Sequence, residues 1–208
     1  MGNLIYPIVF SVIVGVFGLT FHYGGMILLI LIILFLLYLL FAFFANIIKY
    51  TFKKQLLNKK HFVFPLTIIF LLIIFYVMLV FSLQQPTPSL DTKQNLSERL
   101  NYLVKTDQKD RSSLYFIFNP NRDRLRINYV YHMIESKKSL NAEDKYNAAI
   151  ILQHGNSAKD FQTAFKLSKA AYDEGLQKAE WLSKATYDRW QISKGKPQKY
   201  NTQTNIEF

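Results

Sequence analysis

The sequence of 208 residues contains no cysteine. Disulfide bonds, thiolate metal ligands and a cysteine nucleophile are therefore excluded, whereas the redox compartment stays open. Histidine is also scarce, with four residues in the chain. His132 and Glu135 share a helical face, but no third ligand is placed beside them, so we expect a solvated face there, and no metal site or other cofactor.

Charge is missing from the start of the chain. Residues 1–48 contain no Asp, Glu, Lys or Arg, and the first acidic residue is Asp91. The formal net charge is +11, and five of the positive charges fall within one short segment, at Lys49, Lys53, Lys54, Lys59 and Lys60. The positive excess elsewhere suits solubility, an acidic partner or an anionic lipid surface, and it is too weak to indicate a nucleic-acid partner.

Three long apolar stretches occupy this part of the chain, at residues 4–21, 26–48 and 62–83. A helix needs about 20 apolar residues to cross the hydrocarbon core of a bilayer. We therefore predict a transmembrane region over residues 1–83, with three helical spans and the lipid bilayer as its partner. The first stretch lacks the positive start and the small-residue cleavage site of a signal peptide, which favours a retained span. No span carries an ionisable side chain at mid-depth, so a transporter or channel is not expected.

The loops between these stretches indicate their orientation. The loop between the second and third stretches holds all five lysines, whereas the loop at residues 22–25 holds no lysine or arginine. Short positive loops stay in the cytoplasm, so the chain is predicted to emerge on the other side after the third span. In a bacterium this describes a multi-pass protein of the cell inner membrane, with its C-terminal domain on the periplasmic or extracellular side.

The remainder of the chain is typical of a small, mainly α-helical soluble domain at residues 95–208. A polar linker with two prolines precedes it at residues 84–94. Apolar residues recur at helical spacing from Leu96, and residues 107–118 either form a second helix or contain a short strand at 114–118. Further helices are expected at residues 122–138, 141–153, 160–174 and 177–193, followed by an extended polar tail.

Local signals mark the ends of these helices. Asn141 with Asp144 is typical of a helix N-terminus, and Gly155, Gly175 and Gly195 are typical of helix ends. The helices also carry small residues that would let them pack closely. This pattern resembles one unit of the Sel1-like and tetratricopeptide repeats. Because a stable array needs about three copies and no second copy is visible, we expect a single helical hairpin within a compact domain, built around Ala148, Ala164, Ala171 and Ala179.

Four short motifs follow one another in this domain: DQKDR at 107–111, QH at 153–154, DR at 188–189 and GKPQKYNTQ at 195–203. Together they resemble an uncharacterised bacterial domain family of unknown function, over residues 95–203. The chain departs from that family at Asn201, where the family has glycine, and at residues 135–140, where it has a Gly-Trp-Pro turn. The resemblance implies no activity.

Each motif residue has a structural interpretation beside a functional one. Asp107 and Arg111 suit a surface ion pair, His154 suits a contact with a helix dipole, and the tail suits a network that fixes the C-terminus. The run Arg122, Arg124 and Arg126 predicts a solvated or phosphate-attracting surface. In the functional interpretation the tail folds over the helices to build one polar cleft, with candidate ligand-binding residues Asp107, Gln108, Arg111, Gln153, His154, Asp188, Arg189, Gln198, Tyr200, Thr202 and Gln203.

These features favour a membrane-anchored module that binds a small polar or anionic ligand or a protein partner. The first alternative is a hydrolase or transferase in the same cleft, with His154 as general base and Asp107 or Asp188 orienting it. No Ser or Thr nucleophile is placed by the sequence, so the catalytic residues and the enzyme status stay open. The second alternative is a membrane effector whose soluble domain is a sensor.

Overall fold

The computed structural model describes residues 5–21, 23–52, 54–89, 94–136 and 139–203. Every regular element within these ranges is a helix, so the predicted mainly α fold is confirmed for the described part of the chain. The chain forms two compact units. The apolar unit comprises Met1–Leu83 and Lys109–Tyr115, and the polar unit comprises Gln84–Gln108 and Phe116–Phe208.

Three apolar helices form the body of the apolar unit: α1 (Ile5–Thr20), α2 (Gly24–Thr51) and α3 (Lys60–Phe81). With 28 and 22 residues, α2 and α3 are long and apolar enough to cross a membrane, and few of their side chains are buried. α1 is also apolar but has only 16 residues. All three predicted stretches are therefore helical, and two of them have the length of a span.

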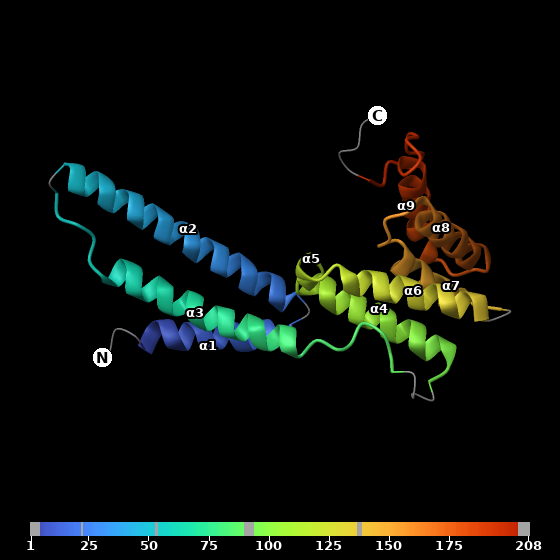
Figure 1. Ribbon diagram of the computed structural model, residues 1–208, viewed down its shortest axis with the longest axis horizontal. Coiled ribbons are helices and arrows are strands. Elements are labelled where there is room, and N and C mark those ends of the chain that lie inside the picture. The colour runs from blue at the N-terminus through green and yellow to red at the C-terminus, as the bar shows by residue number, and fades with distance from the viewer. Residues whose placement is uncertain (1–4, 22, 53, 90–93, 137–138, 204–208) are drawn as a thin grey trace. The chain divides into compact units, whose positions relative to one another are not determined.

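The apolar helices approach one another closely. α3 lies against both α1 and α2 (Figure 1), and its buried Ile68 and Leu72 form a small core with Leu28. A Cβ atom added to Gly15 of α1 would lie only 2.1 Å from the ring of Phe75. Small residues at such contacts let helix backbones come together, as they do in membrane proteins.

The polar unit is built mainly from α4 (Leu96–Ser112), α6 (Asn121–Ser136), α7 (Ala142–Leu152), α8 (Ala158–Asp173) and α9 (Ala179–Ile192). The end of α4 and the first residue of the single-turn α5 (Tyr115–Phe118) belong to the apolar unit. Leu114 has a φ of 58°, a left-handed conformation that ends the helical path between α4 and α5. Of the two alternatives for this stretch, the strand at 114–118 is wrong, since Tyr115–Phe118 is a helical turn and has no strand to pair with among the described residues.

The helix ends follow the sequence signals with one exception. The Asn141 side chain accepts a 2.8 Å hydrogen bond from the backbone N–H of Asp144, as predicted. Gly175 and Gly195 have φ values of 95° and 67°, which suit glycine at helix ends. Gly155 differs because a Cβ there would lie 2.5 Å from the Asp160 side chain, so it is required for close approach and not for a left-handed turn.

The core of the polar unit is formed by large apolar side chains of α4, α6 and α7, together with alanines of α7 and α8 and Leu182 of α9. α8 packs against both α7 and α9 (Figure 1). The inner face of α9 carries four buried residues: Ala179, Leu182, Ala185 and Thr186. Small residues at these contacts allow the helices to pack closely. The polar motif residues lie near the ends of these helices.

Candidate functional site

His154 and Asp107 lie side by side in the polar unit. His154 follows α7, and its Nε2 atom is 3.5 Å from Oδ2 of Asp107 on α4. The side chain of Asp107 is 1% exposed, whereas that of His154 is 20% exposed. Gln108 donates a 3.0 Å hydrogen bond from its Nε2 atom to the same carboxylate oxygen. A buried carboxylate thus faces an imidazole that is partly open to solvent.

A buried arginine on α6 extends this cluster. The Nη1 atom of Arg126 lies 4.0 Å from Oδ1 of Asp107 and donates a 3.1 Å hydrogen bond to Oδ1 of Asp123. Its Nε atom donates to the hydroxyl of Thr106 at 3.2 Å. Arg126 is fully buried, so its guanidinium compensates the charge of Asp107 in a site that water does not reach.

The predicted solvated surface at the arginine run is wrong for two of its three members. Arg122 and Arg126 are buried, and only Arg124 is exposed. Residues four apart fall on the same face of a helix, and here Arg122 and Arg126 share the inner face of α6. Arg122 donates a 2.6 Å hydrogen bond to the carbonyl oxygen of Gln84.

The exposed edge of His154 opens into a cleft of about 540 Å³, which we call the polar cleft. Three asparagines, two carboxylates, a tyrosine and an arginine join the imidazole in its lining, so most of the lining residues have a polar side chain. α6 forms one side, and the segment between α7 and α8 forms the other. The lining residues are Pro120, Asn121, Asp123, Arg124, Ile127, Asn128, Tyr131, His154, Gly155, Asn156 and Asp160.

Asp160 fixes the wall of the polar cleft opposite α6. Its Oδ2 atom accepts hydrogen bonds from the backbone N–H and the hydroxyl of Ser157, at 3.1 and 2.6 Å, which completes a capping box at the start of α8. Its Oδ1 atom accepts a 2.8 Å hydrogen bond from the hydroxyl of Tyr131. Burial and the neighbouring Asp160 raise the pKa of Tyr131 to about 12. Tyr131 is therefore a protonated donor at neutral pH and not a nucleophile.

A second cluster, which we call the tail clasp, forms where the C-terminal tail meets α9. The carboxylate of Asp188 accepts hydrogen bonds from the backbone N–H groups of Lys199, Tyr200 and Thr202 and from the Thr202 hydroxyl, all between 2.8 and 3.2 Å. Burial alone would raise the pKa of Asp188, but these hydrogen bonds outweigh it and hold the pKa below its usual value. Asp188 thus fixes the tail as an ionised carboxylate.

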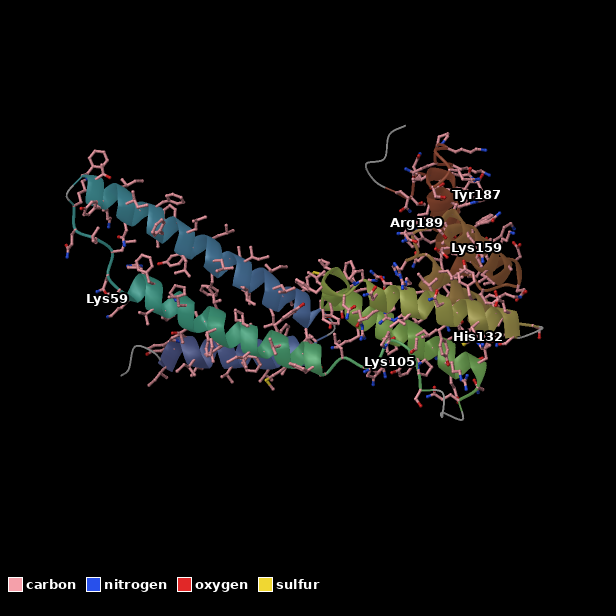
Figure 2. The ribbon with its side chains drawn as sticks, in the orientation of Figure 1. Lys59, Lys105, His132, Lys159, Tyr187 and Arg189 are labelled. Atoms are coloured by element: carbon pink, nitrogen blue, oxygen red, sulfur yellow. The ribbon has the colours of Figure 1, made fainter. Side chains whose placement is uncertain are left out.

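Arg189 joins the tail to the end of α7. Its Nε atom donates a 2.9 Å hydrogen bond to Oε1 of Gln203, and its Nη1 atom donates to the carbonyl oxygen and side chain of Gln153 at 3.0 and 3.2 Å. Figure 2 labels Arg189 on α9, near the C-terminal tail. Gln198 and Gln203 close the tail on itself through two hydrogen bonds of 2.7 and 2.8 Å.

A smaller hollow of about 310 Å³ lies beside Arg189. Gly155 lines both this hollow and the polar cleft, so the segment after α7 separates them. Gln153 faces the smaller hollow and His154 faces the polar cleft. The tail motif is therefore bound by Asp188 and Arg189, and Arg189 links it to Gln153. His154 instead lies beside Asp107.

The candidate residue Arg111 belongs to Lys109–Tyr115, which is part of the apolar unit. His132 and Glu135 are both exposed. Over the described ranges of the chain, no three His, Asp or Glu side chains are arranged to hold a metal ion.

Asn201 adopts the conformation that glycine favours. Its φ is 52°, and asparagine is one of the few other residues that enter this left-handed region readily. Asparagine at a position where the resembled family has glycine is thus compatible with the turn between Tyr200 and Thr202.

The chain has no match among family models, curated proteins or solved structures. The two clusters differ in the groups that they leave for a ligand. The tail clasp is saturated by its own hydrogen bonds and leaves little for a ligand. The polar cleft offers an oriented imidazole, free amide groups and an exposed arginine, which suit a ligand that is rich in hydrogen-bonding groups.

Proposed function

We propose that this chain is a membrane-anchored module whose polar unit binds a small polar or anionic ligand in the polar cleft. The observation that carries the proposal is the position of His154, which is held by a buried carboxylate at one edge and lines a cleft of about 540 Å³ at the other. Such a cleft has the size of a small-molecule site.

The polar groups of the lining support a ligand that is rich in hydrogen-bonding groups. Asp123 is engaged by Arg126, and Asp160 is engaged by Ser157 and Tyr131. Arg124 remains as a charged donor for a ligand, and the imidazole and the asparagine amides can each donate or accept hydrogen bonds. Hydroxyl-rich, carboxylate-bearing or phosphate-bearing small molecules match this set.

Membrane attachment is the second part of the proposal. The lengths of α2 and α3 support it, since both are long and apolar enough to cross a bilayer. We propose that α1 is a third span and that the lysine-rich segment between α2 and α3 is cytoplasmic, which would place the polar unit outside the cytoplasm. The proposed location is the inner membrane of a bacterium, and membership of the uncharacterised family suggested by the motifs is part of the same proposal.

A hydrolase or transferase is the second candidate function. The specific observation in its favour is the separation of 3.5 Å between His154 and Asp107, because a carboxylate at this position orients an imidazole for general base catalysis. The substrate would then supply its own nucleophile or use water, since the lining has no serine, threonine or cysteine.

The binding proposal is tested with the full chain purified in detergent. Thermal unfolding is followed in the presence of a panel of sugars, amino acids, dicarboxylates and sugar phosphates. At least one class is expected to raise the midpoint for the unmodified chain and for His132→Gln, and to lose most of this effect in His154→Gln and Asn128→Leu. His132, labelled in Figure 2, is a matched control because it is an exposed histidine outside the polar cleft.

If no class acts, or if His132→Gln and His154→Gln respond alike, the binding proposal is overturned. Turnover of a ligand that binds would favour the second candidate, provided that Asp107→Asn slows turnover more than it weakens binding. Membrane attachment has its own test: alkaline carbonate should leave the chain in the membrane pellet. A reporter fused after Phe208 should be active outside the cytoplasm.

A further inference from the structure

We infer that the apolar unit holds one phospholipid with an anionic headgroup in a cavity between its helices. This inference rests on the membrane attachment proposed above, and it assigns a ligand to a unit that otherwise acts only as an anchor. The cavity has a volume of about 500 Å³ and is lined by Phe10, Leu31, Leu34, Phe35, Tyr38, Lys60, His61, Phe64 and Pro65.

The cavity is apolar along most of its length. α1 contributes one phenylalanine, α2 contributes leucine and aromatic side chains, and α3 contributes Phe64 and Pro65. Leu34 and Phe64 are 54% and 39% exposed, so the cavity is open at the surface of the unit. In a bilayer this opening would face lipid, and an acyl chain could enter from the side without crossing a polar barrier.

The polar groups of the lining come from one turn of α3 and from Tyr38 of α2. The hydroxyl of Tyr38 and Nδ1 of His61 are 2.8 Å apart, which joins the two helices across the cavity. Lys60 lies beside His61 in the first turn of α3, where the helix dipole adds positive potential. An amphipathic ligand would thus find an apolar slot that ends in hydrogen-bonding groups and a cation.

The positive charge at the polar end of the cavity favours an anionic headgroup. No Asp or Glu occurs before Asp91, while five lysines lie between residues 49 and 60. The lysine side of the apolar unit therefore has no carboxylate of its own segment to balance its charge. Basic pockets between membrane helices on the cytoplasmic side bind anionic headgroups, and each lysine near an anionic surface contributes about 1 kcal/mol.

The cavity favours a lipid over a free anion because the apolar part of its lining is much larger than the polar part. An inorganic phosphate would use Lys60 and His61 alone, whereas a phospholipid would also bury an acyl chain against Phe35, Leu31 and Phe64. The two sources of phosphate can therefore be separated by experiment.

The test uses the full chain in non-ionic detergent. Phosphatidylglycerol and phosphatidylcholine with the same acyl chains are added, and bound lipid is counted by native mass spectrometry while thermal unfolding is recorded. One phosphatidylglycerol is expected to remain bound per chain and to raise the midpoint by about 5 °C. Phosphatidylcholine and inorganic phosphate are expected to have little effect.

Two variants locate the site, and one variant is their control. Lys60→Gln should weaken phosphatidylglycerol binding about fivefold, which corresponds to the loss of one lysine at an anionic surface. Leu34→Trp fills the apolar part and should abolish binding without changing the charge. Lys59→Gln removes the same charge one residue away, at a position outside the lining that Figure 2 labels, and should retain binding.

The outcomes separate this inference from the proposed function. Equal binding of both lipids, or equal losses in Lys59→Gln and Lys60→Gln, would overturn the inference while leaving membrane attachment intact. An equal response to inorganic phosphate would replace the lipid by a free anion and also overturn it. Release of the chain by alkaline carbonate would instead show that the membrane attachment itself had failed.

Discussion

The two units use the same kind of helix contact but differ in what they bury. In the apolar unit, Gly15 meets the ring of Phe75, and large apolar side chains such as Phe41 and Phe70 are 73% and 65% exposed. In the polar unit, alanines line the helix contacts, and charged side chains such as Arg126 and Asp188 are fully buried. Close helix packing is therefore shared, and the polar unit also buries the ionic pair of Asp107 and Arg126.

This difference fits the proposed surroundings of the two units, which are lipid for the apolar unit and water for the polar unit. Lipid gives no hydrophobic drive between apolar helices, so the fit of backbones and small residues must hold them together. Water supplies that drive in the polar unit, and buried charges are then retained where they fix one arrangement, provided that each has a partner. The polar unit should accordingly be most sensitive to loss of a charge, and the apolar unit to added volume.

The largest effect is expected for Arg126→Met. The substitution keeps an unbranched apolar stem but removes the cation that faces the buried carboxylate of Asp107, and it should lower the free energy of unfolding by about 3–5 kcal/mol. Both tryptophans of the chain lie on α9, so urea unfolding followed by their fluorescence reports on the polar unit. The exposed Arg124→Met should change stability by less than about 0.5 kcal/mol. Similar losses for the two variants would contradict the assigned network.

Asp188→Asn should have the next largest effect, because an amide cannot accept all the hydrogen bonds of the tail clasp. We expect a loss of about 2–3 kcal/mol, measured by the same fluorescence assay. The pKa of Asp188 is lowered in the folded chain, so the clasp contributes its full stability above the unfolded value of about 3.9 and loses it as the pH falls through the folded pKa.

The acid dependence gives this prediction a second readout. Asp188→Asn should be less sensitive to acid than the unmodified chain, and the amides of Lys199, Tyr200 and Thr202 should exchange hydrogen faster at neutral pH. Asp173→Asn is the control, since its carboxylate forms an exposed ion pair with Lys169 and should change stability little. Unchanged exchange in Asp188→Asn would show that the tail is held by other contacts.

Local signals in the sequence predicted most of the helices. Apolar spacing placed α6 to α9, and the Asn141 cap and the glycine at 175 marked ends that the structure places within a residue or two. Each of these signals depends on residues that are close in the sequence, so it can be recognised without knowing the tertiary structure. The choice between a helix and a strand at 114–118 stayed open because aromatic and β-branched composition cannot reveal whether a partner strand exists.

The candidate site was only partly accessible to the same reasoning. The motifs identified Asp107, His154 and Asp188, whose partners come from distant parts of the chain. Arg126 was missed as a partner because a run of arginines usually signals a solvated face, and burial of one member depends on how α4 and α6 pack. The Ser157 and Asp160 capping box had a local signal, a serine three residues before an acid, that could have found it.

A larger side chain at a helix contact tests whether the apolar unit is sensitive to added volume. Gly15→Leu would drive a side chain into the ring of Phe75 and should weaken the contact of α1 with α3 by about 2 kcal/mol. Since the chain has no cysteine, Ser11→Cys supplies a single probe at a fully buried position of α1. Maleimide should label this probe faster in the Gly15→Leu background. Val16→Leu, at a site that is 51% exposed, should leave the labelling rate unchanged.

The smallest effect is expected at Asn201, a residue of the polar unit that has a left-handed backbone conformation although it is not glycine. Asn201→Ala should cost about 1 kcal/mol, because a Cβ without a polar side chain is disfavoured at a φ of 52°. Asn201→Gly should stay within about 0.5 kcal/mol of the unmodified chain, since the gain in backbone fit is offset by the flexibility of glycine in the unfolded state. Lys199→Ala is the neighbouring control, because it keeps the backbone N–H group that donates a hydrogen bond to Asp188. A larger loss for Asn201→Gly than for Asn201→Ala would mean that the asparagine side chain, and not the backbone angle, holds the turn.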